Sequence, residues 1–282
     1  MLILQKIFKK EIGETPKKIV QLTGGSINNV YRCKLIDRDL VIKLNISHKH
    51  PKMFEKEKSG LELISKSKFL IPKPIIAGSF ENYDYLILEY IKPGTVLNWQ
   101  LFGKNLASLH KINNDKFGLN QDNYIGSLKQ HNNFQKDWGA FYSNQRLLKL
   151  AKDARDLNLL SKIDSQKIDS LCKNLKNIVP KSKPSLIHGD LWVGNLMSNV
   201  ENKPVLFDPA VYFGHPEMDW AMLSLFGSYP EEAMKNYCEF LPLENGFNDR
   251  KDIHQLYPLM VHLILFGSSY YQNVTNILNR YN

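Results

Sequence analysis

Residues 188–195 read His-Gly-Asp-Leu-Trp-Val-Gly-Asn, so that Asp190 stands five positions before Asn195. A further aspartate, Asp208, follows thirteen residues later, directly after the apolar run Val-Leu-Phe. Phosphoryl transfer needs a carboxylate beside the attacking hydroxyl and oxygen ligands for the Mg²⁺ that bridges the phosphates. Each of these residues alone is a weak signal. The ordered set predicts Asp190 as the proton acceptor, with Asn195 and Asp208 as metal ligands.

The first half of the chain contains a turn that suits phosphate binding. Residues 23–29 read Thr-Gly-Gly-Ser-Ile-Asn-Asn and separate two β-like segments. Because glycine allows the backbone to approach a ligand closely, Gly24, Gly25 and Ser26 are candidate contacts to nucleotide phosphates. An ordinary hairpin turn has a similar composition, so the turn by itself leaves both interpretations open.

A lysine, Lys43, ends the strand-like sequence Val-Ile-Lys, where it would reach the α and β phosphates. Most lysines with such a pattern lie on the surface. The helix predicted next in the chain offers Glu55 and Glu57, and a kinase-type site pairs its lysine with a glutamate of that helix. We prefer Glu57 as the partner, although the spacing admits either residue.

The junction of the two halves is formed by Leu88, Glu89 and Tyr90. Backbone groups of such a connector can hydrogen-bond the edge of an adenine, although any linker between two lobes would look similar. We therefore name these three residues as the candidate adenine-binding segment.

Two further polar residues flank the central motif. His188 is a candidate second contact to the substrate, but we favour a structural role because Asp190 already fills the role of base. Asp219 opens a predicted helix, where it either caps the helix or braces the catalytic loop from below.

Periodicity predicts an α+β chain with a β-rich half followed by a helical half. We expect a first lobe over residues 1–90 and a second over 91–282, with a nucleotide cleft between them. The break falls at Pro93-Gly94. Strands are predicted near 17–23, 28–36, 38–44, 75–80 and 84–90. Helices are predicted at 1–12, 52–67, 99–112, 134–156, 162–178, 217–227, 230–241 and 252–279, with an irregular interruption at 184–212.

Composition limits the class of protein. The 282 residues carry a formal net charge of +9, but the lysines are scattered and no basic-and-aromatic motif stands out, so we expect no nucleic-acid partner. Cys33, Cys172 and Cys238 lie far apart, which predicts neither disulfides nor a zinc site. No apolar run approaches the roughly eighteen residues of a membrane span. We expect a cytoplasmic protein without a membrane partner.

The chain resembles the fructosamine kinase (ketosamine-3-kinase) family, within the superfamily of aminoglycoside phosphotransferases and choline kinases. The strongest match is residues 186–195, followed by Asp-Pro-Ala at 208–210 and Gly-His-Pro-Glu-Met-Asp at 214–219. Trp192, after Asp-Leu, is typical of the ketosamine branch. A second match covers 117–126, with Asp-Trp at 137–138 and Arg-Leu at 146–147.

The resemblance implies a bilobal protein-kinase-like fold. The first lobe would be a small antiparallel sheet with one main helix, and the second lobe would be larger and mostly helical. It also implies ATP and Mg²⁺ as cofactors and a ketosamine, a sugar joined to an amine, as the acceptor. Phosphorylation at the sugar 3-hydroxyl destabilises such an adduct and releases the amine, which repairs the glycated molecule.

The same resemblance suggests how the acceptor is held. Trp192 is a candidate platform for the sugar, although a buried loop anchor is nearly as good an interpretation. Asp122, in the second match, is a candidate substrate contact. Some family members carry a cysteine near the position of Ser26, so redox control through this loop is not expected here.

Two alternatives stay open. Another small-molecule kinase, acting on an aminoglycoside, choline or a sugar, would share the same phosphoryl-transfer residues, but the positive net charge argues mildly against cationic acceptors. A non-catalytic nucleotide-binding pseudokinase is disfavoured because every catalytic residue type is present.

Overall fold

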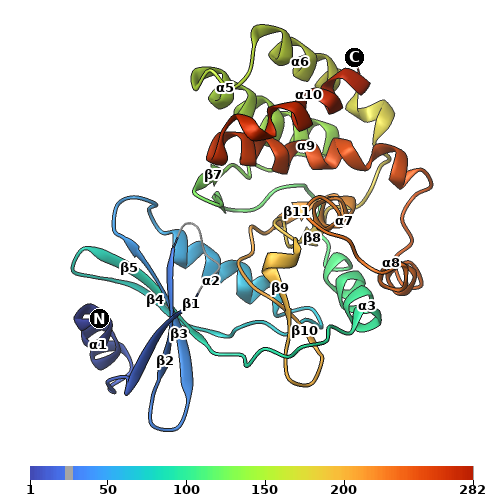
Figure 1. Ribbon diagram of the computed structural model, residues 1–282. Coiled ribbons are helices and arrows are strands. Elements are labelled where there is room, and N and C mark those ends of the chain that lie inside the picture. Colours follow the sequence, from blue (N-terminus) through green and yellow to red (C-terminus); the bar gives the residue numbers. More distant parts are fainter. Residues whose placement is uncertain (23–27, 282) are drawn as a thin grey trace.

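The computed structural model describes residues 1–22 and 28–281. After helix α1 (Leu2–Glu11), the chain forms a five-stranded antiparallel sheet in the order β1-β2-β3-β5-β4 (Figure 1). The strands are β1 (Lys18–Leu22), β2 (Asn29–Lys34), β3 (Asp39–Ile46), β4 (Pro74–Phe80) and β5 (Tyr83–Glu89). Short turns suffice between neighbouring antiparallel strands, and helix α2 (Met53–Ile64) enters between β3 and β4.

Both faces of this sheet are covered, because alternate residues of a strand point to opposite faces. Tyr85 and Ile87 of β5 belong to the apolar cluster that includes Leu4, Ile7 and Phe8 of helix α1 (Leu2–Glu11). Leu86 and Leu88, one position out of phase, pack instead with Phe54 and Leu61 of α2. Helix α2 therefore lies between the sheet and the rest of the protein (Figure 1).

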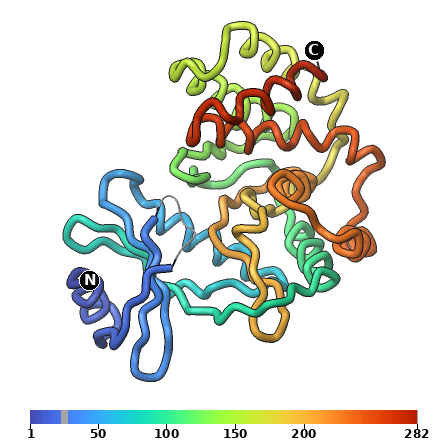
Figure 2. The backbone as a smooth tube through the Cα atoms, in the orientation of Figure 1, coloured from blue at the N-terminus to red at the C-terminus, as the bar shows by residue number. Residues whose placement is uncertain are grey.

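The remainder of the chain is mostly helical. Its helices are α3 (Trp99–His110), α4 (Trp138–Phe141), α5 (Leu148–Asp156), α6 (Lys162–Ile178), α7 (Glu217–Leu223), α8 (Glu231–Cys238), α9 (Phe247–Phe266) and α10 (Tyr271–Arg280). The backbone tube shows α9 and α10 running back beside α5 and α6 (Figure 2). Three short antiparallel pairs complete the lobe: β6 (Asn123–Ile125) with β7 (Leu128–Gln130), β8 (Ser185–Ile187) with β11 (Tyr212–Gly214), and β9 (Leu196–Ser198) with β10 (Pro204–Leu206).

Two predicted helices differ from the structure. The prediction for 134–156 is wrong in its start and continuity, because α4 and α5 are joined by a π-helical turn, Tyr142–Leu147. The prediction for 252–279 is broken at Gly267, whose φ of +90° ends α9 before a short 3₁₀ turn and α10. The three-residue strands β6 to β11 were not predicted individually, since they are too short to show an alternating pattern.

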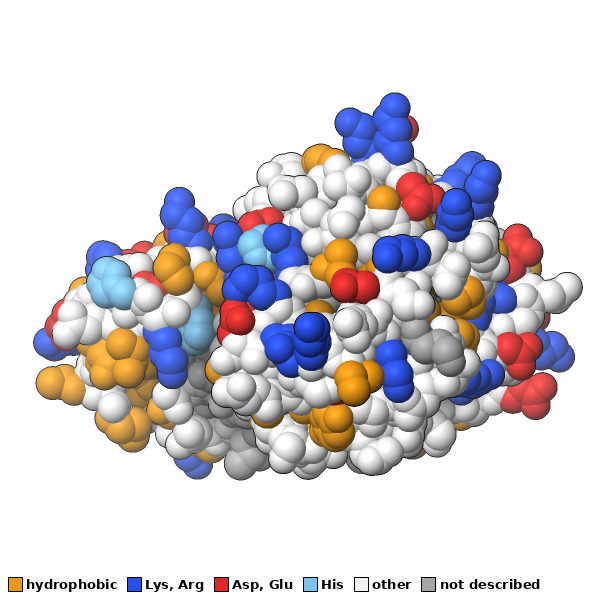
Figure 3. All heavy atoms as spheres, turned by 90° about the horizontal axis from the view of Figure 1, so that it is seen from above, with side chains coloured by type: hydrophobic (Ala, Val, Ile, Leu, Met, Phe, Trp, Pro, Cys, Tyr) orange, Lys and Arg blue, Asp and Glu red, His pale blue; other side chains and the backbone are white. Residues whose placement is uncertain are grey.

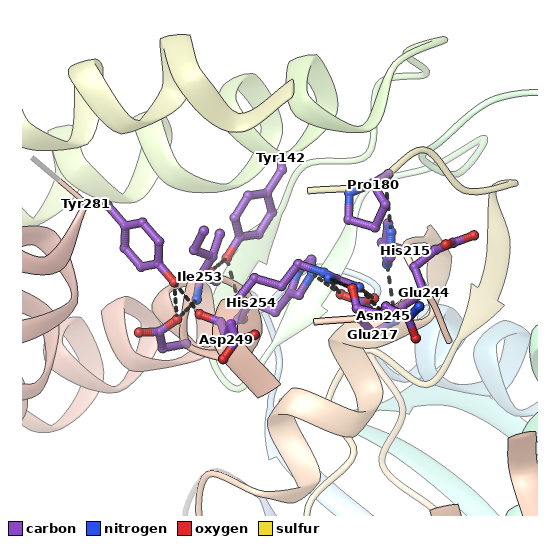
Figure 4. Close-up of polar contacts among 12 residues, drawn as sticks. Tyr142, Pro180, His215, Glu217, Glu244, Asn245, Asp249, Ile253, His254 and Tyr281 are labelled. Carbon is purple, nitrogen blue, oxygen red and sulfur yellow. Dashed lines mark hydrogen bonds and ion pairs between the residues drawn. The ribbon is translucent and has the colours of Figure 1, made fainter. Parts of the chain in front are cut away.

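Helix α9 contains a proline, Pro258, without losing its course. Proline has no N–H, so the carbonyl of His254, four residues earlier, lacks its helical donor. The hydroxyl of Tyr142 lies beside that gap and donates to the carbonyl of Ile253 at 2.6 Å and towards that of His254 at 3.4 Å (Figure 4). Tyr142 of the π-helical turn thus supplies a hydrogen-bond donor for the carbonyl groups of α9 next to Pro258.

The two lobes share packing across the predicted boundary. Ile64 at the end of α2 and Phe69 after it belong to the large apolar core that also holds Phe102 of α3 and Trp220 of α7. The division at residue 90 remains a prediction. Within the described residues no helix is both long and apolar enough to cross a membrane.

Surface charge is distributed over the molecule. On the face drawn in Figure 3, lysine and arginine side chains form small separate groups among neutral and acidic ones. This agrees with the scattered lysines of the sequence.

Candidate active site

One cavity lies where the sheet, α2, the β6–β7 hairpin and the central loops meet. It gathers the predicted Lys43, Glu57, Asp190, Trp192, Asn195 and Asp208, which come from widely separated parts of the chain. The remaining lining residues are Asn28, Val30, Met53, Lys56, Asn123, Tyr124, Ile125, Gly126, Pro209, Val261, His262, Leu265 and Phe266.

Lys43 projects from β3 and is only 5% exposed. Its Nζ donates to Oε1 of Glu57 at 2.6 Å and also pairs with the carboxylate of Asp208. Burial alone would lower the pKa of Lys43, but the two carboxylates outweigh burial and raise it. The structure distinguishes between the two candidate glutamates, because Glu57 forms the ion pair with Lys43 while Glu55 is exposed.

Asp190 follows β8 and is fixed by Asn195. The Nδ2 of Asn195 donates to the carbonyl of Asp190 at 2.9 Å and to its Oδ2 at 3.0 Å. Burial, reinforced by the charges of Asp208 and Asp219, raises the pKa of Asp190 to about 7, although the hydrogen bond from Asn195 opposes the shift. A carboxyl group with such a pKa is suited to accept a proton near neutral pH.

The loop before Asp190 is braced from below. Asp219 on α7 accepts hydrogen bonds from the backbone N–H of His188 at 2.7 Å and of Gly189 at 2.9 Å, and its Oδ2 lies 3.2 Å from Nε2 of His110. Of the two roles considered for Asp219, the structure shows the brace. Gly189 has a φ of +80°, and a Cβ there would lie 2.2 Å from the carbonyl oxygen of Ala210, so the turn requires glycine.

The suggestion that His188 contacts the substrate is wrong. Its side chain is fully buried, with Nε2 3.0 Å from the carbonyl of Phe207 and Nδ1 accepting from the N–H of Asp190 at 3.3 Å. Both ring nitrogens are therefore engaged inside the loop, as the structural interpretation of His188 expected.

Trp192 reaches the cavity and lies over Gly194. A Cβ on Gly194 would come within 2.3 Å of the indole ring, which leaves no room for a side chain. The indole also meets the ring of Phe226 edge-on, with 6.3 Å between the centroids. The second glycine of the motif thus sets where the tryptophan ring can lie.

Asp122 is not among the residues that line the cavity. Its carboxylate is occupied within the hairpin region, by Lys129 at 3.1 Å, His131 at 3.3 Å and the N–H of Asn132 at 2.9 Å. These partners hold Asp122 beside the cavity rather than in its lining, so a direct substrate contact by Asp122 stays a prediction. Its neighbour Tyr124 lines the cavity instead.

A buried polar network supports the loop that carries Asp208. Asn123 donates to the carbonyl of Val211 at 2.8 Å, and Gln130 donates to that of Ala210 at 2.9 Å. Asn132 links Asn123 to the fully buried Arg146, which donates to it at 2.8 Å. The Arg146 guanidinium lies over the ring of Tyr212, 4.0 Å from its centroid. The second sequence match thus corresponds to a scaffold behind Asp208.

Two groups of predicted nucleotide contacts remain. Gly24, Gly25 and Ser26 fall outside the described residues. Leu88, Glu89 and Tyr90 stand at the end of β5 but do not line the cavity. The N–H groups of Glu89 and Tyr90 donate to the carbonyls of Lys73 at 2.9 Å and Asp39 at 3.4 Å, so adenine binding by this segment remains a proposal.

Sequence reasoning missed the contribution of α9. Val261, His262, Leu265 and Phe266 line the cavity, although they follow Asp190 by more than seventy residues. His262 packs against Phe226 with 4.6 Å between ring centroids. The segment is apolar and belongs to the helix predicted at 252–279, and nothing in its local pattern distinguishes a cavity wall from ordinary core.

A second polar cluster lies away from the cavity, around Glu217 (Figure 4). Arg250 pairs with both oxygens of Glu217, and Nε2 of His254 lies 3.0 Å from one of them. His215 has Nε2 3.2 Å from the carbonyl of Pro180, and its Nδ1 accepts from the N–H of Glu217 at 3.3 Å. One possible ligand atom from each of the three side chains lies within 4.8 Å of the others. The contacts above engage both ring nitrogens of His215, both oxygens of Glu217 and Nε2 of His254, while Nδ1 of His254 is buried without a hydrogen-bond partner among the described residues. We assign this cluster a structural role.

The fold and this cavity define a phosphotransferase of the protein-kinase-like class, which phosphorylates a hydroxyl group. The chain belongs to the fructosamine kinase family, whose model matches residues 3–282. This match confirms the predicted resemblance, and the solved structures of the same fold confirm the predicted fold class. Membership of a kinase family implies ATP as the phosphate donor.

Individual relatives agree with this family. A protein of Enterococcus faecium named probable ketoamine kinase is 35% identical over 268 residues, covering 94% of this chain and 95% of its own. The chloroplastic protein-ribulosamine 3-kinase of Arabidopsis thaliana is 34% identical over 272 residues, covering 94% of this chain and 82% of the plant protein.

Solved structures show the same fold. A crystal structure assigned as a fructosamine-3-kinase from Haemophilus somnus has a TM-score of 0.86 and 28% identity, covering 99% of this chain and 97% of that one. The aminoglycoside phosphotransferase APH(4)-Ia, solved as a ternary complex with AMP-PNP and hygromycin B, has a TM-score of 0.65 at 15% identity, covering 100% of this chain and 99% of that one. The latter likeness concerns the fold alone.

Proposed function

We propose that the protein transfers the terminal phosphate of ATP to the 3-hydroxyl of the sugar in a ketosamine. The observation that carries this proposal is the convergence of Lys43, Asp190 and Asp208 on one cavity in a chain of the fructosamine kinase family. The names of the relatives, ketoamine kinase and protein-ribulosamine 3-kinase, support the same acceptor class. The plant relative also supports a protein-bound ketosamine as a substrate.

Lys43 is placed to orient the phosphates. Its ammonium is held between Glu57 and Asp208, so its position is fixed before a nucleotide binds. Backbone groups of Gly24, Gly25 and Ser26 would cover the phosphates, and the segment Leu88 to Tyr90 would meet the adenine. These contacts follow from the resemblance of the chain to the family.

The donor set of the cavity fits Mg²⁺. This cation prefers oxygen ligands, and Asp208 has a side chain that is 41% exposed despite its contact with Lys43. Asn195 uses its Nδ2 to hold Asp190, which leaves its carbonyl oxygen for a cation. Asp208 and Asn195 would hold Mg²⁺, which supplies neutralisation of the phosphate charge when bound.

Asp190 would orient the 3-hydroxyl of the acceptor and accept its proton. The brace from Asp219 and the hydrogen bonds from Asn195 fix the direction of its carboxylate. Trp192 would form a wall against which the sugar packs. Release of the amine from the phosphorylated adduct would then repair the glycated molecule, and we place this activity in the cytoplasm.

The test is ATP consumption with a panel of acceptors. Wild type, Asp190→Asn and the exposed control Asp115→Asn are assayed with a ribulosamine, a fructosamine, choline and an aminoglycoside, and the phosphorylated position is mapped by NMR. We expect turnover of a ketosamine at the 3-hydroxyl, and a loss of about 10³-fold in kcat only in Asp190→Asn. Preference for choline or an aminoglycoside would overturn the acceptor assignment. ATP binding without turnover on any acceptor would indicate a pseudokinase.

A further inference from the structure

Two lysines, Lys43 and Lys56, line the cavity, and only Lys43 forms ion pairs with carboxylates of the described residues. Lys43 is matched by Glu57 and Asp208, as described above. Lys56, one position before Glu57 on α2, lines the same cavity and is partly buried. Among residues 1–22 and 28–281, no carboxylate oxygen lies within ion-pair distance of its Nζ.

The acidic residues nearest to Lys56 do not neutralise it. The carboxylate of Asp122 is taken by Lys129 and His131, and Glu55 is exposed on the helix. Burial lowers the pKa of Lys56. The charge of Asp122 opposes this shift, but Lys129 and Lys52 add to it, and the net shift is downward. The surroundings of this ammonium are therefore short of negative charge.

Lys56 is also held in place. Its Nζ lies over the ring of Tyr124, 5.2 Å from the centroid, a contact that attracts a cation to the aromatic face. The hydroxyl of Tyr124 donates to the carbonyl of Pro51 at 3.0 Å, and the ring of His50 meets that of Tyr124 edge-on at 6.0 Å. These contacts keep the ring, and with it the ammonium, against the wall formed by α2 and the β6–β7 hairpin.

We propose that Lys56 forms a subsite for an anionic group on the acceptor, so that the preferred ketosamines carry a carboxylate or a phosphate. An anion placed there would supply the negative charge that Lys56 lacks, and a partly desolvated ion pair is stronger than an exposed one. The inference rests on the proposed function, because it assumes that a ketosamine occupies this cavity. The ATP phosphates have their own cation in Lys43.

The test compares acceptors with and without an anionic group. The reference, called neutral because it carries no anionic group, is the ribulosamine of glycinamide. The ribulosamine of glycine adds a carboxylate, and the 5-phosphate of the glycinamide adduct adds a phosphate on the sugar. Each acceptor is assayed with wild type, Lys56→Gln and Lys56→Arg. Lys58→Gln is the matched control, because Lys58 lies on the same helix, does not line the cavity and pairs weakly with Glu62 at 4.0 Å.

We expect wild type to show a kcat/KM about tenfold higher for one of the two anionic acceptors than for the neutral one. Lys56→Gln should remove that preference while leaving the neutral acceptor and the KM for ATP within about twofold of wild type. Lys56→Arg should retain most of the preference, and Lys58→Gln should behave as wild type. Whichever anion is preferred identifies the group that the subsite holds.

Three results would overturn the subsite. One is equal turnover of all three acceptors by wild type. Another is an anion preference that survives in Lys56→Gln. The third is a higher KM for ATP with every acceptor in Lys56→Gln, which would assign Lys56 to the nucleotide. Absence of turnover on any ketosamine would instead defeat the proposed function, so the two failures are distinguishable.

Discussion

The Oδ2 of Asp219 lies 2.7 Å from the backbone nitrogen of His188, across thirty-one positions of sequence. The other oxygen of the same carboxylate accepts from Gly189, so one buried side chain satisfies two consecutive N–H groups of the loop. Because the next residue is Asp190, helix α7 sets the height and direction of the proposed proton acceptor.

Replacement of this brace should damage catalysis more than ATP binding. Asp219→Asn presents an N–H where one backbone donor needs an acceptor. We expect a fall of about 1–3 kcal/mol in the free energy of unfolding and a fall of about tenfold or more in kcat, with the KM for ATP nearly unchanged. Denaturant unfolding and steady-state kinetics measure these effects, with the exposed Asp153→Asn as control. Wild-type kcat in a fully folded variant would refute the bracing role.

The choice of Glu57 over Glu55 can be tested on a single helix. Glu57→Gln weakens the buried pair with Lys43, so we expect kcat/KM for ATP to fall by about 10²-fold, comparable to the loss of one preorganised electrostatic contact. Glu55→Gln changes an exposed carboxylate one position from Lys56 and two from Glu57, and should stay within about twofold of wild type. Equal effects of the two substitutions would contradict the assignment.

Gly194 should control the acceptor through Trp192. In Gly194→Ala the added methyl group would occupy the space of the indole ring. We expect the ring to move, which would raise the KM for the acceptor by about tenfold while the KM for ATP changes little. Gly13→Ala is a control that introduces a methyl group into open space, although at a positive φ. An unchanged acceptor KM in a folded Gly194→Ala variant would show that the indole position does not matter.

The buried cluster around Glu217 should make stability depend on pH. Burial, assisted by the neighbouring His254, lowers the pKa of His215 from 6.5 to about 3. Between pH 6.5 and about 3, His215 is therefore protonated in the unfolded chain and neutral in the folded chain. This contribution to stability is complete above pH 6.5 and is lost as the pH falls from there towards 3.

Glu217 contributes to the stability of the fold in a lower pH range. Burial would raise its pKa, but His254 and Arg250 outweigh burial and lower it from 4.5 to about 2, so its contribution is lost only below pH 4.5. Urea unfolding at pH 7.5 and 5.5 should therefore report histidine titration. We expect His215→Gln to lose less stability than wild type between these two pH values, and the exposed His48→Asn to lose as much as wild type. If His215→Gln loses as much stability as wild type between these pH values, His215 is not the cause of the pH dependence.

Much of the architecture followed from local pattern. Short β-like segments separated by turn residues, the helical spacing of α2 and the Pro93-Gly94 break predicted a sheet lobe followed by helices, and the observed fold confirms it. The predictions differed from the structure where a strand was too short to show a period, or where an apolar stretch ran on without a visible break. Three-residue strands such as β6 show no period, and the apolar sequence around Gly267 did not reveal that its backbone turns there.

The sequence by itself determined the residue types at residues 188–195, the later Asp208 and the lysine of β3, and with them the family and the phosphoryl-transfer chemistry. Only the tertiary structure decided that Glu57 pairs with Lys43, that Asp219 braces His188, that His188 and Asp122 lie outside the cavity, and that α9 forms one of its walls. The reason is that periodicity reports which face of an element is apolar, because burial acts on each residue locally. Contacts between residues far apart in the chain depend on how packed elements are placed relative to one another, which no local pattern records.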